Sequence, residues 1–128
     1  VDSLKVAKKL NDSRPKTKGP LKVCIQLNID EEISKSGISS REIEVFLSEC
    51  SDLKNIEVRG LMVIPKPRNS IQDQHEIFKK VKGIFDSLNQ KNIKIDTLSM
   101  GMSSDYGPAI REGSTMVRIG TGIFGLRK

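Results

Sequence analysis

The chain has 128 residues, of which 36% are hydrophobic and 30% charged, and this balance fits one globular domain with a modest core. No apolar run approaches the ~20 residues that a membrane-spanning helix needs, and no charged-then-apolar leader is visible, so we expect a cytoplasmic protein with no membrane partner. The formal net charge of +6 permits an anionic ligand or a nucleic-acid surface. Seven basic residues lie between Lys5 and Lys22 with no aromatic among them, which favours a solvated surface over an RNA-binding module.

The first half of the chain predicts helices and a strand in alternation. Leu4, Ala7 and Leu10 recur at helical spacing over residues 3–11, and a Pro- and Gly-containing loop follows over residues 12–20. Residues 22–28 are rich in β-formers and predict a strand. After a polar loop over residues 30–37, the next helix is predicted from a capping box and an apolar pattern, namely Ser39-Ser40-Arg41-Glu42 followed by Ile43, Phe46, Leu47 and Cys50.

The second half continues the alternation. Residues 56–64 predict a second strand, and a long helix follows Ser70 with one apolar stripe, formed by Ile77, Phe78, Val81, Ile84, Phe85 and Leu88. A third strand is predicted over residues 95–100, a short helix over residues 105–112 with Gly113 as its C′ residue, and a fourth strand over residues 115–119.

The resulting order is αβαβαβαβ, in which strands joined by crossover helices pair in parallel. An eight-stranded barrel typically needs ~250 residues, so four strands suit a small open sheet or half of such a barrel. The chain opens at Val1 inside a helix pattern and without a methionine. We therefore expect an α/β fold in which residues 1–128 form a single domain, the C-terminal half of a TIM-type (β/α)8 barrel.

Two segments carry the chemistry, and each follows an apolar strand. Met102-Ser103-Ser104-Asp105 ends the third predicted strand and Arg118-Ile119-Gly120-Thr121 ends the fourth. Together they offer hydroxyls, free backbone N–H groups and one cation. In α/β barrels the loops after the last strands commonly hold a phosphate, so this pair predicts a site for a phosphate-bearing ring cofactor.

Arg118 is the informative residue of this pair. Strand alternation turns Val117 and Ile119 toward the helices and Arg118 toward the opposite side. A buried guanidinium stays charged and needs an acceptor. Two partners remain open at this point: a structural salt bridge to Asp96 or Asp105, or a heteroatom of a ligand.

The neighbouring residues suit an anion. Gly120 lets the backbone N–H groups around Thr121 approach a phosphate closely. Ser103 and Ser104 precede a helix, so they either cap it or contact the phosphate, and the two roles are compatible.

Other patterns carry weaker chemistry. Residues 120–125 spell G-x-G-x-x-G, but no acidic residue for a ribose follows, which argues against dinucleotide binding. His75 is the only histidine and is interpreted as a surface residue, so no catalytic pair or metal site is expected around it. We interpret the acidic run at residues 30–32 (Asp30, Glu31, Glu32) as solvated, and Cys24 and Cys50 as reduced core thiols.

Four motifs together resemble the pyridoxal 5′-phosphate homeostasis protein family, the alanine-racemase-like barrel family also described as proline-synthetase co-transcribed: SKSGI (34–38), RGLMVIP (59–65), LSMGMSSD (98–105) and GSTMVRIGTGIFG (113–125). The resemblance covers nearly all of this chain and the C-terminal half of the family. It implies pyridoxal phosphate (PLP) as cofactor, with Ser103, Gly120 and Thr121 at the phosphate, Ser104 contributing its amide, and Arg118 facing the pyridine nitrogen.

The family's Schiff-base lysine stands at the end of the first barrel strand, a region that this chain does not contain. A charged arginine opposite the pyridine nitrogen keeps that nitrogen unprotonated, which weakens the ring as an electron sink. The resemblance therefore implies vitamin B6 homeostasis or carriage, with PLP-dependent apo-enzymes as recipients and no catalytic residue in this chain.

The alternative is a PLP-dependent amino-acid racemase, which needs a lysine and a second acid–base residue. Lys35 and Lys66 are the only lysines expected near the barrel mouth. Because half a barrel leaves strand edges and an inner face uncovered, we also expect self-association or a missing partner segment.

Overall fold

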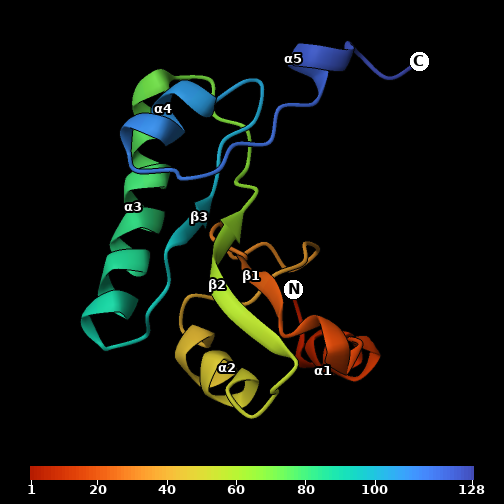
Figure 1. The fold of residues 1–128 in the computed structure, drawn as a ribbon. Helices are drawn as coiled ribbons and strands as arrows, with labels where there is room; N and C mark the ends of the chain where they lie inside the picture. The colour runs from red at the N-terminus through yellow and green to blue at the C-terminus, as the bar shows by residue number, and fades with distance from the viewer.

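The computed structural model describes residues 1–128 as a parallel α/β fold (Figure 1). Its elements are α1 (Leu4–Ser13), the 3-10 turn η1 (Lys16–Lys18), β1 (Leu21–Leu27), α2 (Ile43–Cys50), β2 (Ile56–Val63), α3 (Ile71–Gln90), β3 (Thr97–Ser99), α4 (Tyr106–Arg111) and α5 (Thr121–Phe124). The strands lie in the order β1-β2-β3 and pair in parallel. The predicted α/β class is thus confirmed.

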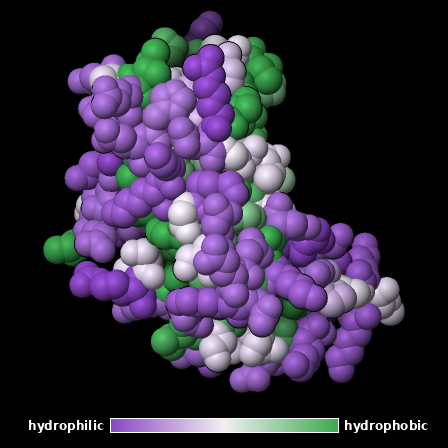
Figure 2. Space-filling model, turned by 90° about the vertical axis from the view of Figure 1, so that its left-hand side faces the viewer, coloured by the Kyte–Doolittle hydropathy of each residue, from purple (hydrophilic) through white to green (hydrophobic).

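Two of the predicted helices, α1 and α3, begin at a serine cap, and α3 has one apolar face. The hydroxyls of Ser3 and Ser70 accept hydrogen bonds from the backbone N–H groups of Val6 and Asp73, at the start of α1 and α3. All of the predicted α3 stripe is buried except Ile84, which is partly buried. The opposite side of α3 is polar, and Figure 2, which views the molecule from this side, is hydrophilic over most of its area.

The helices cover one face of the sheet. Strand residues that point toward them are buried and form the core with the helix stripes, namely Ile25, Leu27, Leu61, Val63 and Leu98. The alternate residues Cys24, Gln26 and Met62 on the other face are only partly buried. This second face carries no helix in Figure 1.

Gly60 allows the strands to approach one another at the centre of the sheet. A Cβ built at this position would lie 1.7 Å from the carbonyl oxygen of Thr97 on β3, so no other residue fits. The register between β1 and β2 shifts here, with Val23 opposite Val58 and Cys24 opposite Gly60, and Arg59 is the extra residue of a bulge.

The prediction of a fourth regular strand is wrong. Residues 115–119 make one parallel bridge, between Ser99 and Met116, instead of a ladder. The reason lies in two hydroxyls. Thr115 Oγ1 accepts the hydrogen bond from Leu98 N at 2.7 Å, and Ser114 Oγ lies 2.6 Å from the carbonyl oxygen of Met100. The hydroxyls add to backbone bonds from Met116 N to the carbonyl oxygen of Leu98 (3.3 Å) and from Met100 N to that of Met116 (3.1 Å). The segment therefore runs beside β3 without forming a regular strand, and the order αβαβαβαβ is not realised.

Two boundaries also differ from expectation. The predicted capping box is wrong: Glu42 is itself the N-cap residue of α2 and no side chain caps this helix. The third strand is shorter than predicted, covering residues 97–99 instead of 95–100. No helix in the structure is both long enough and apolar enough to cross a bilayer.

Candidate functional site

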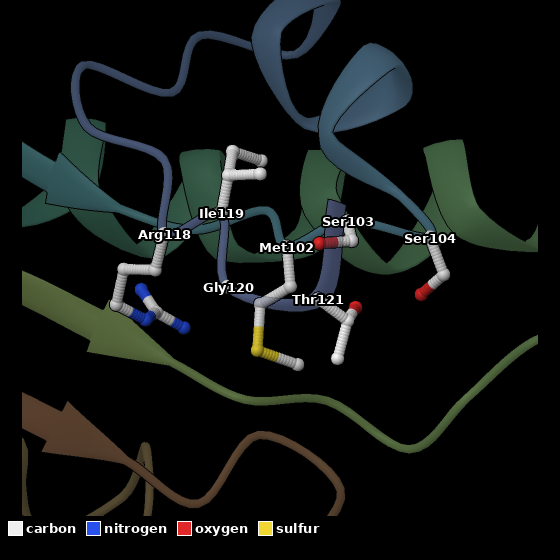
Figure 3. A pocket seen from close by; sticks show the side chains of 7 residues that line it. All are labelled: Met102, Ser103, Ser104, Arg118, Ile119, Gly120 and Thr121. Atoms are coloured by element: carbon white, nitrogen blue, oxygen red, sulfur yellow. The ribbon is translucent and has the colours of Figure 1, made fainter. Parts of the chain in front are cut away.

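A cavity of about 510 Å³ lies at the C-terminal end of β3 (Figure 3). Two segments line it, one following β3 and the other leading into α5, with the residues Met102, Ser103, Ser104, Arg118, Ile119, Gly120 and Thr121. All five residues predicted to hold a cofactor are among them. The cavity lies where ligands gather in α/β barrels, at the carboxyl ends of parallel strands, and binding of a cofactor by these five residues stays a prediction.

Gly101 brings the two segments together. Its φ of +102° turns the chain out of β3, and its carbonyl oxygen accepts a hydrogen bond from Arg118 N at 2.9 Å. A Cβ at Gly101 would lie 2.7 Å from the Cβ of Ala109, so α4 packs directly against the bare backbone. The turn continues with Met102 N donating to Asp105 Oδ1 at 2.8 Å.

The guanidinium of Arg118 is held by two uncharged acceptors. Nη1 donates to Ser99 Oγ at 2.7 Å on β3, and Nη2 donates to the carbonyl oxygen of Val63 at 2.9 Å on β2. Burial lowers the pKa of Arg118, and the negative charge of Asp105 acts in the opposite direction. An arginine has five N–H donors, so three remain for a ligand.

The structural salt bridge considered for Arg118 is not formed. Asp96 instead pairs with Arg59 and accepts a hydrogen bond from the Thr97 hydroxyl at 2.9 Å. The carboxylate of Asp105 accepts the Met102 N–H. Arg118 therefore keeps its whole positive charge at the edge of the cavity. Figure 3 shows its terminal nitrogens on the same side of the chain as Met102 and Thr121.

The other side of the cavity is rich in backbone donors. The N–H groups of Ser103, Ser104, Gly120 and Thr121 have no acceptor within the protein. A Cβ at Gly120 would meet no protein atom within 4 Å, so the missing side chain widens the cavity and serves no packing role. Such clustered donors beside a fixed cation form a concave site for an anion.

The two serines do not cap α4, contrary to one of the two predicted roles. Asp105 occupies the N-cap position, and no side chain bonds to the first turn. Ser103 Oγ instead accepts a hydrogen bond from Gly122 N at 2.9 Å and joins the two cavity segments. Ser104 is exposed at the cavity rim.

Three interpretations of polar residues need correction. His75 is not a free surface side chain, because its Nδ1 lies 3.0 Å from Glu112 Oε1 and joins α3 to the end of α4. Asp30 is not solvated: its side chain is 10% exposed and bonds to Arg68. Glu32 lies between Lys35 (3.0 Å) and Lys66 (3.5 Å), so neither lysine lines the cavity.

The thiols are reduced, as expected, but only Cys50 is fully buried. Cys24 is half-buried on the uncovered face of the sheet. Burial raises the pKa of both thiols.

Sequence reasoning missed Ser99. It is 3% exposed and is the one polar side chain among the buried residues. The signal that could have revealed Ser99 is a hydroxyl in the middle of an apolar strand pattern, because buried polar groups need partners.

The chain is thus an α/β protein in which a cation and free amides gather at the ends of parallel strands, an arrangement suited to an anion. The comparison with known families narrows this class. The chain belongs to the alanine racemase N-terminal domain family, which matches residues 1–128.

Individual relatives agree with this assignment. The chain is 48% identical over 129 residues to the pyridoxal phosphate homeostasis protein of Haemophilus influenzae, and 46% identical over 127 residues to that of Escherichia coli K12. Both comparisons cover 99% of this chain and 54% of the relative. The structure of PipY from Synechococcus elongatus with PLP bound is 30% identical, with a TM-score of 0.83, and the match covers 98% of this chain and 58% of PipY. The chain thus spans about half the length of these relatives.

Proposed function

We propose that this chain contributes the phosphate and ring-nitrogen side of a PLP site in a protein of intracellular PLP homeostasis. The observation that carries the proposal is the joint lining of one cavity by Arg118 and the free amides around Ser103, Ser104, Gly120 and Thr121. The relatives, which are named pyridoxal phosphate homeostasis proteins, and the PLP bound in PipY support this choice of ligand.

The donor set fits this cofactor in charge and in position. Backbone N–H groups and the serine and threonine hydroxyls bind a phosphate dianion, while a guanidinium donates to an unprotonated pyridine nitrogen. When bound, PLP supplies an electron sink, and that sink is strongest when the ring nitrogen is protonated. Arg118 offers only donors and keeps its own protons, so it holds the ring in the weaker form.

A binding role fits better than robust catalysis. The seven cavity residues include no carboxylate, histidine or lysine, so nothing that lines the cavity can accept a proton from a substrate. Lys35 and Lys66, the amines considered for a substitute Schiff base, are paired with Glu32. We therefore favour a carrier, from which PLP-dependent apo-enzymes receive the cofactor, over an amino-acid racemase.

We further propose that residues 1–128 form one partial barrel. The amino group of Val1 donates to the carbonyl oxygen of Cys24 at 2.8 Å, and Gln26 N donates to the carbonyl oxygen of Val1 at 2.8 Å. This is the pattern of a parallel ladder at the free edge of β1. The pairing of Val1 at this edge, together with the length of the relatives, supports the C-terminal half of a (β/α)8 barrel.

Ligand titration tests the binding proposal. We expect the wild-type chain to bind PLP and Arg118→Lys to bind it about 10- to 100-fold more weakly. Lysine keeps the positive charge but lacks the planar guanidinium with its fixed N–H directions, and a hydrogen bond to a charged group contributes ~1.5–3 kcal/mol. Arg127→Lys, at an exposed position, is the matched control. Equal PLP affinity of Arg118→Lys and the control would refute the proposed site. Amino-acid racemisation at ordinary enzyme rates would favour the racemase instead.

A further inference from the structure

Ser99 departs from the pattern of its strand and so requires a physical explanation. Its neighbours Leu98 and Met100 are fully buried apolar residues, whereas Ser99 places a hydroxyl at a position that is 3% exposed. A buried hydroxyl without a partner costs free energy. The partner here is the Arg118 guanidinium, 2.7 Å away.

The two anchors of Arg118 come from two different strands. Ser99 Oγ lies on β3 and the carbonyl oxygen of Val63 at the end of β2, so together they fix both the position and the plane of the guanidinium. A free arginine side chain samples many rotamers, and contacts at two separate nitrogens offset the entropy lost when a single orientation is selected. With Val63 alone, the group could rotate about a single hydrogen bond.

The uncharged nature of the anchors matters as much as their number. A carboxylate in place of Ser99 would neutralise the cation and bind more of its donors. A hydroxyl accepts one hydrogen bond and leaves the net charge of Arg118 available to the cavity. Backbone carbonyls such as that of Val63 act in the same way.

We propose that Ser99 is a positioning residue of the site: its hydroxyl fixes the plane of Arg118 without neutralising it, so that the free N–H groups meet an acceptor atom in the ring of the ligand. This inference rests on the proposed function, because it concerns the ring contact of the same site. It assigns to Ser99 an effect on ring recognition and none on phosphate recognition.

Two phosphate esters separate these effects. Pyridoxine 5′-phosphate carries the ring nitrogen and has no aldehyde that could react with surface lysines, while benzyl phosphate has a ring without nitrogen. In Ser99→Ala we expect the Kd of pyridoxine 5′-phosphate to rise about 5- to 20-fold, less than in Arg118→Lys, because Ser99 acts on the ligand only through the orientation of Arg118. The Kd of benzyl phosphate should stay within twofold of the wild-type value.

Ser114→Ala is the matched control. It removes another partly buried serine hydroxyl close to Ser99. The Ser114 hydroxyl bonds to the carbonyl oxygens of Met100 and Met116 and not to Arg118. A merely structural effect should shift the two ligands by the same factor, so the ratio of their Kd values should change in Ser99→Ala and not in Ser114→Ala. An unchanged ratio in Ser99→Ala would overturn the inference.

A double-mutant cycle tests whether Ser99 acts on the ligand through Arg118. In the Arg118→Lys background, Ser99→Ala should cause no further change in that ratio. If Ser99→Ala does not fold, Ser99→Cys, which keeps the size and weakens the acceptor, should raise the same ratio by a smaller factor, and an unchanged ratio would again refute the inference. Failure of the proposed function looks different, because the wild-type chain would then bind neither ester.

Discussion

Gly101 supports the cavity through its backbone, and Gly101→Ala gives a stability prediction whose magnitude follows from the structure. A non-glycine residue at a φ of +102° costs ~1–3 kcal/mol in backbone strain. The new Cβ would also lie 2.7 Å from the Cβ of Ala109 and 3.1 Å from the Cα of Tyr106. Both neighbours belong to α4, so the helix must move, at a cost of ~1–3 kcal/mol as for overpacking.

The lower entropy of the unfolded alanine variant offsets ~0.4–1 kcal/mol of this cost. We therefore expect Gly101→Ala to lower the free energy of unfolding by about 1–5 kcal/mol. With a urea m-value of ~2 kcal/mol/M, the unfolding midpoint should fall by roughly 0.5–3 M. Circular dichroism at increasing urea concentration measures this shift.

Gly107→Ala is the control for this experiment. Gly107 lies inside α4, and a Cβ there would meet no atom within 4 Å. Alanine is favoured over glycine in a helix by ~0.5–1 kcal/mol, so this variant should be slightly more stable than the wild type. Equal stability of Gly101→Ala and the wild type would refute our account of how β3, α4 and the Arg118 segment are joined.

Three further predictions concern other contacts. Asp30→Asn should destabilise the chain by ~1.5–3 kcal/mol at pH 7, measured by urea unfolding, because Asp30 bonds to Arg68 and to Lys66 N. Arg68 lowers the pKa of Asp30, so this stabilisation is present above the unfolded-state pKa of about 4 and disappears as the pH falls through the lower folded-state value; a variant as acid-sensitive as the wild type would contradict this. Ser103→Ala should weaken inorganic phosphate binding by about 3- to 10-fold in calorimetric titration, through the loss of one hydroxyl, and an unchanged Kd would remove Ser103 from the anion site. Light scattering should find the chain larger than a monomer, because Ile64, Met116 and Phe124 are exposed apolar residues, whereas a monodisperse monomer would contradict the predicted self-association.

Much of the fold followed from the sequence because its signals are local. Ser3 and Ser70 cap α1 and α3 as hydroxyls at helix starts do, and the stripe from Ile77 to Leu88 has the period of a helix facing a core. The five cavity residues followed from one topological rule, that parallel strands end on the same side of a sheet.

The remaining features depend on contacts between distant segments, which periodicity does not encode. Thr115 has a high strand propensity, yet its hydroxyl bonds to Leu98 N and replaces a ladder contact. Ser99 and Val63 are separated from Arg118 by 19 and 55 residues. Glu42 fitted a capping box by spacing, but the chain enters α2 one turn later than that motif requires.

The hydroxyl contacts that Ser114 and Thr115 make with β3 and Met100 have a consequence for the lifetime of any complex with a ligand. A regular strand would tie the Arg118 segment to the sheet through a longer cooperative ladder. Here one bridge, four backbone hydrogen bonds and the hydroxyl contacts hold the segment, and this shorter set can open while β1 to β3 stay paired. Amide hydrogens of residues 115–120 should accordingly exchange with solvent faster than those of β2. Local opening of this segment without global unfolding would give a bound ligand a way out of the cavity, and rapid release is what the proposed carrier role requires.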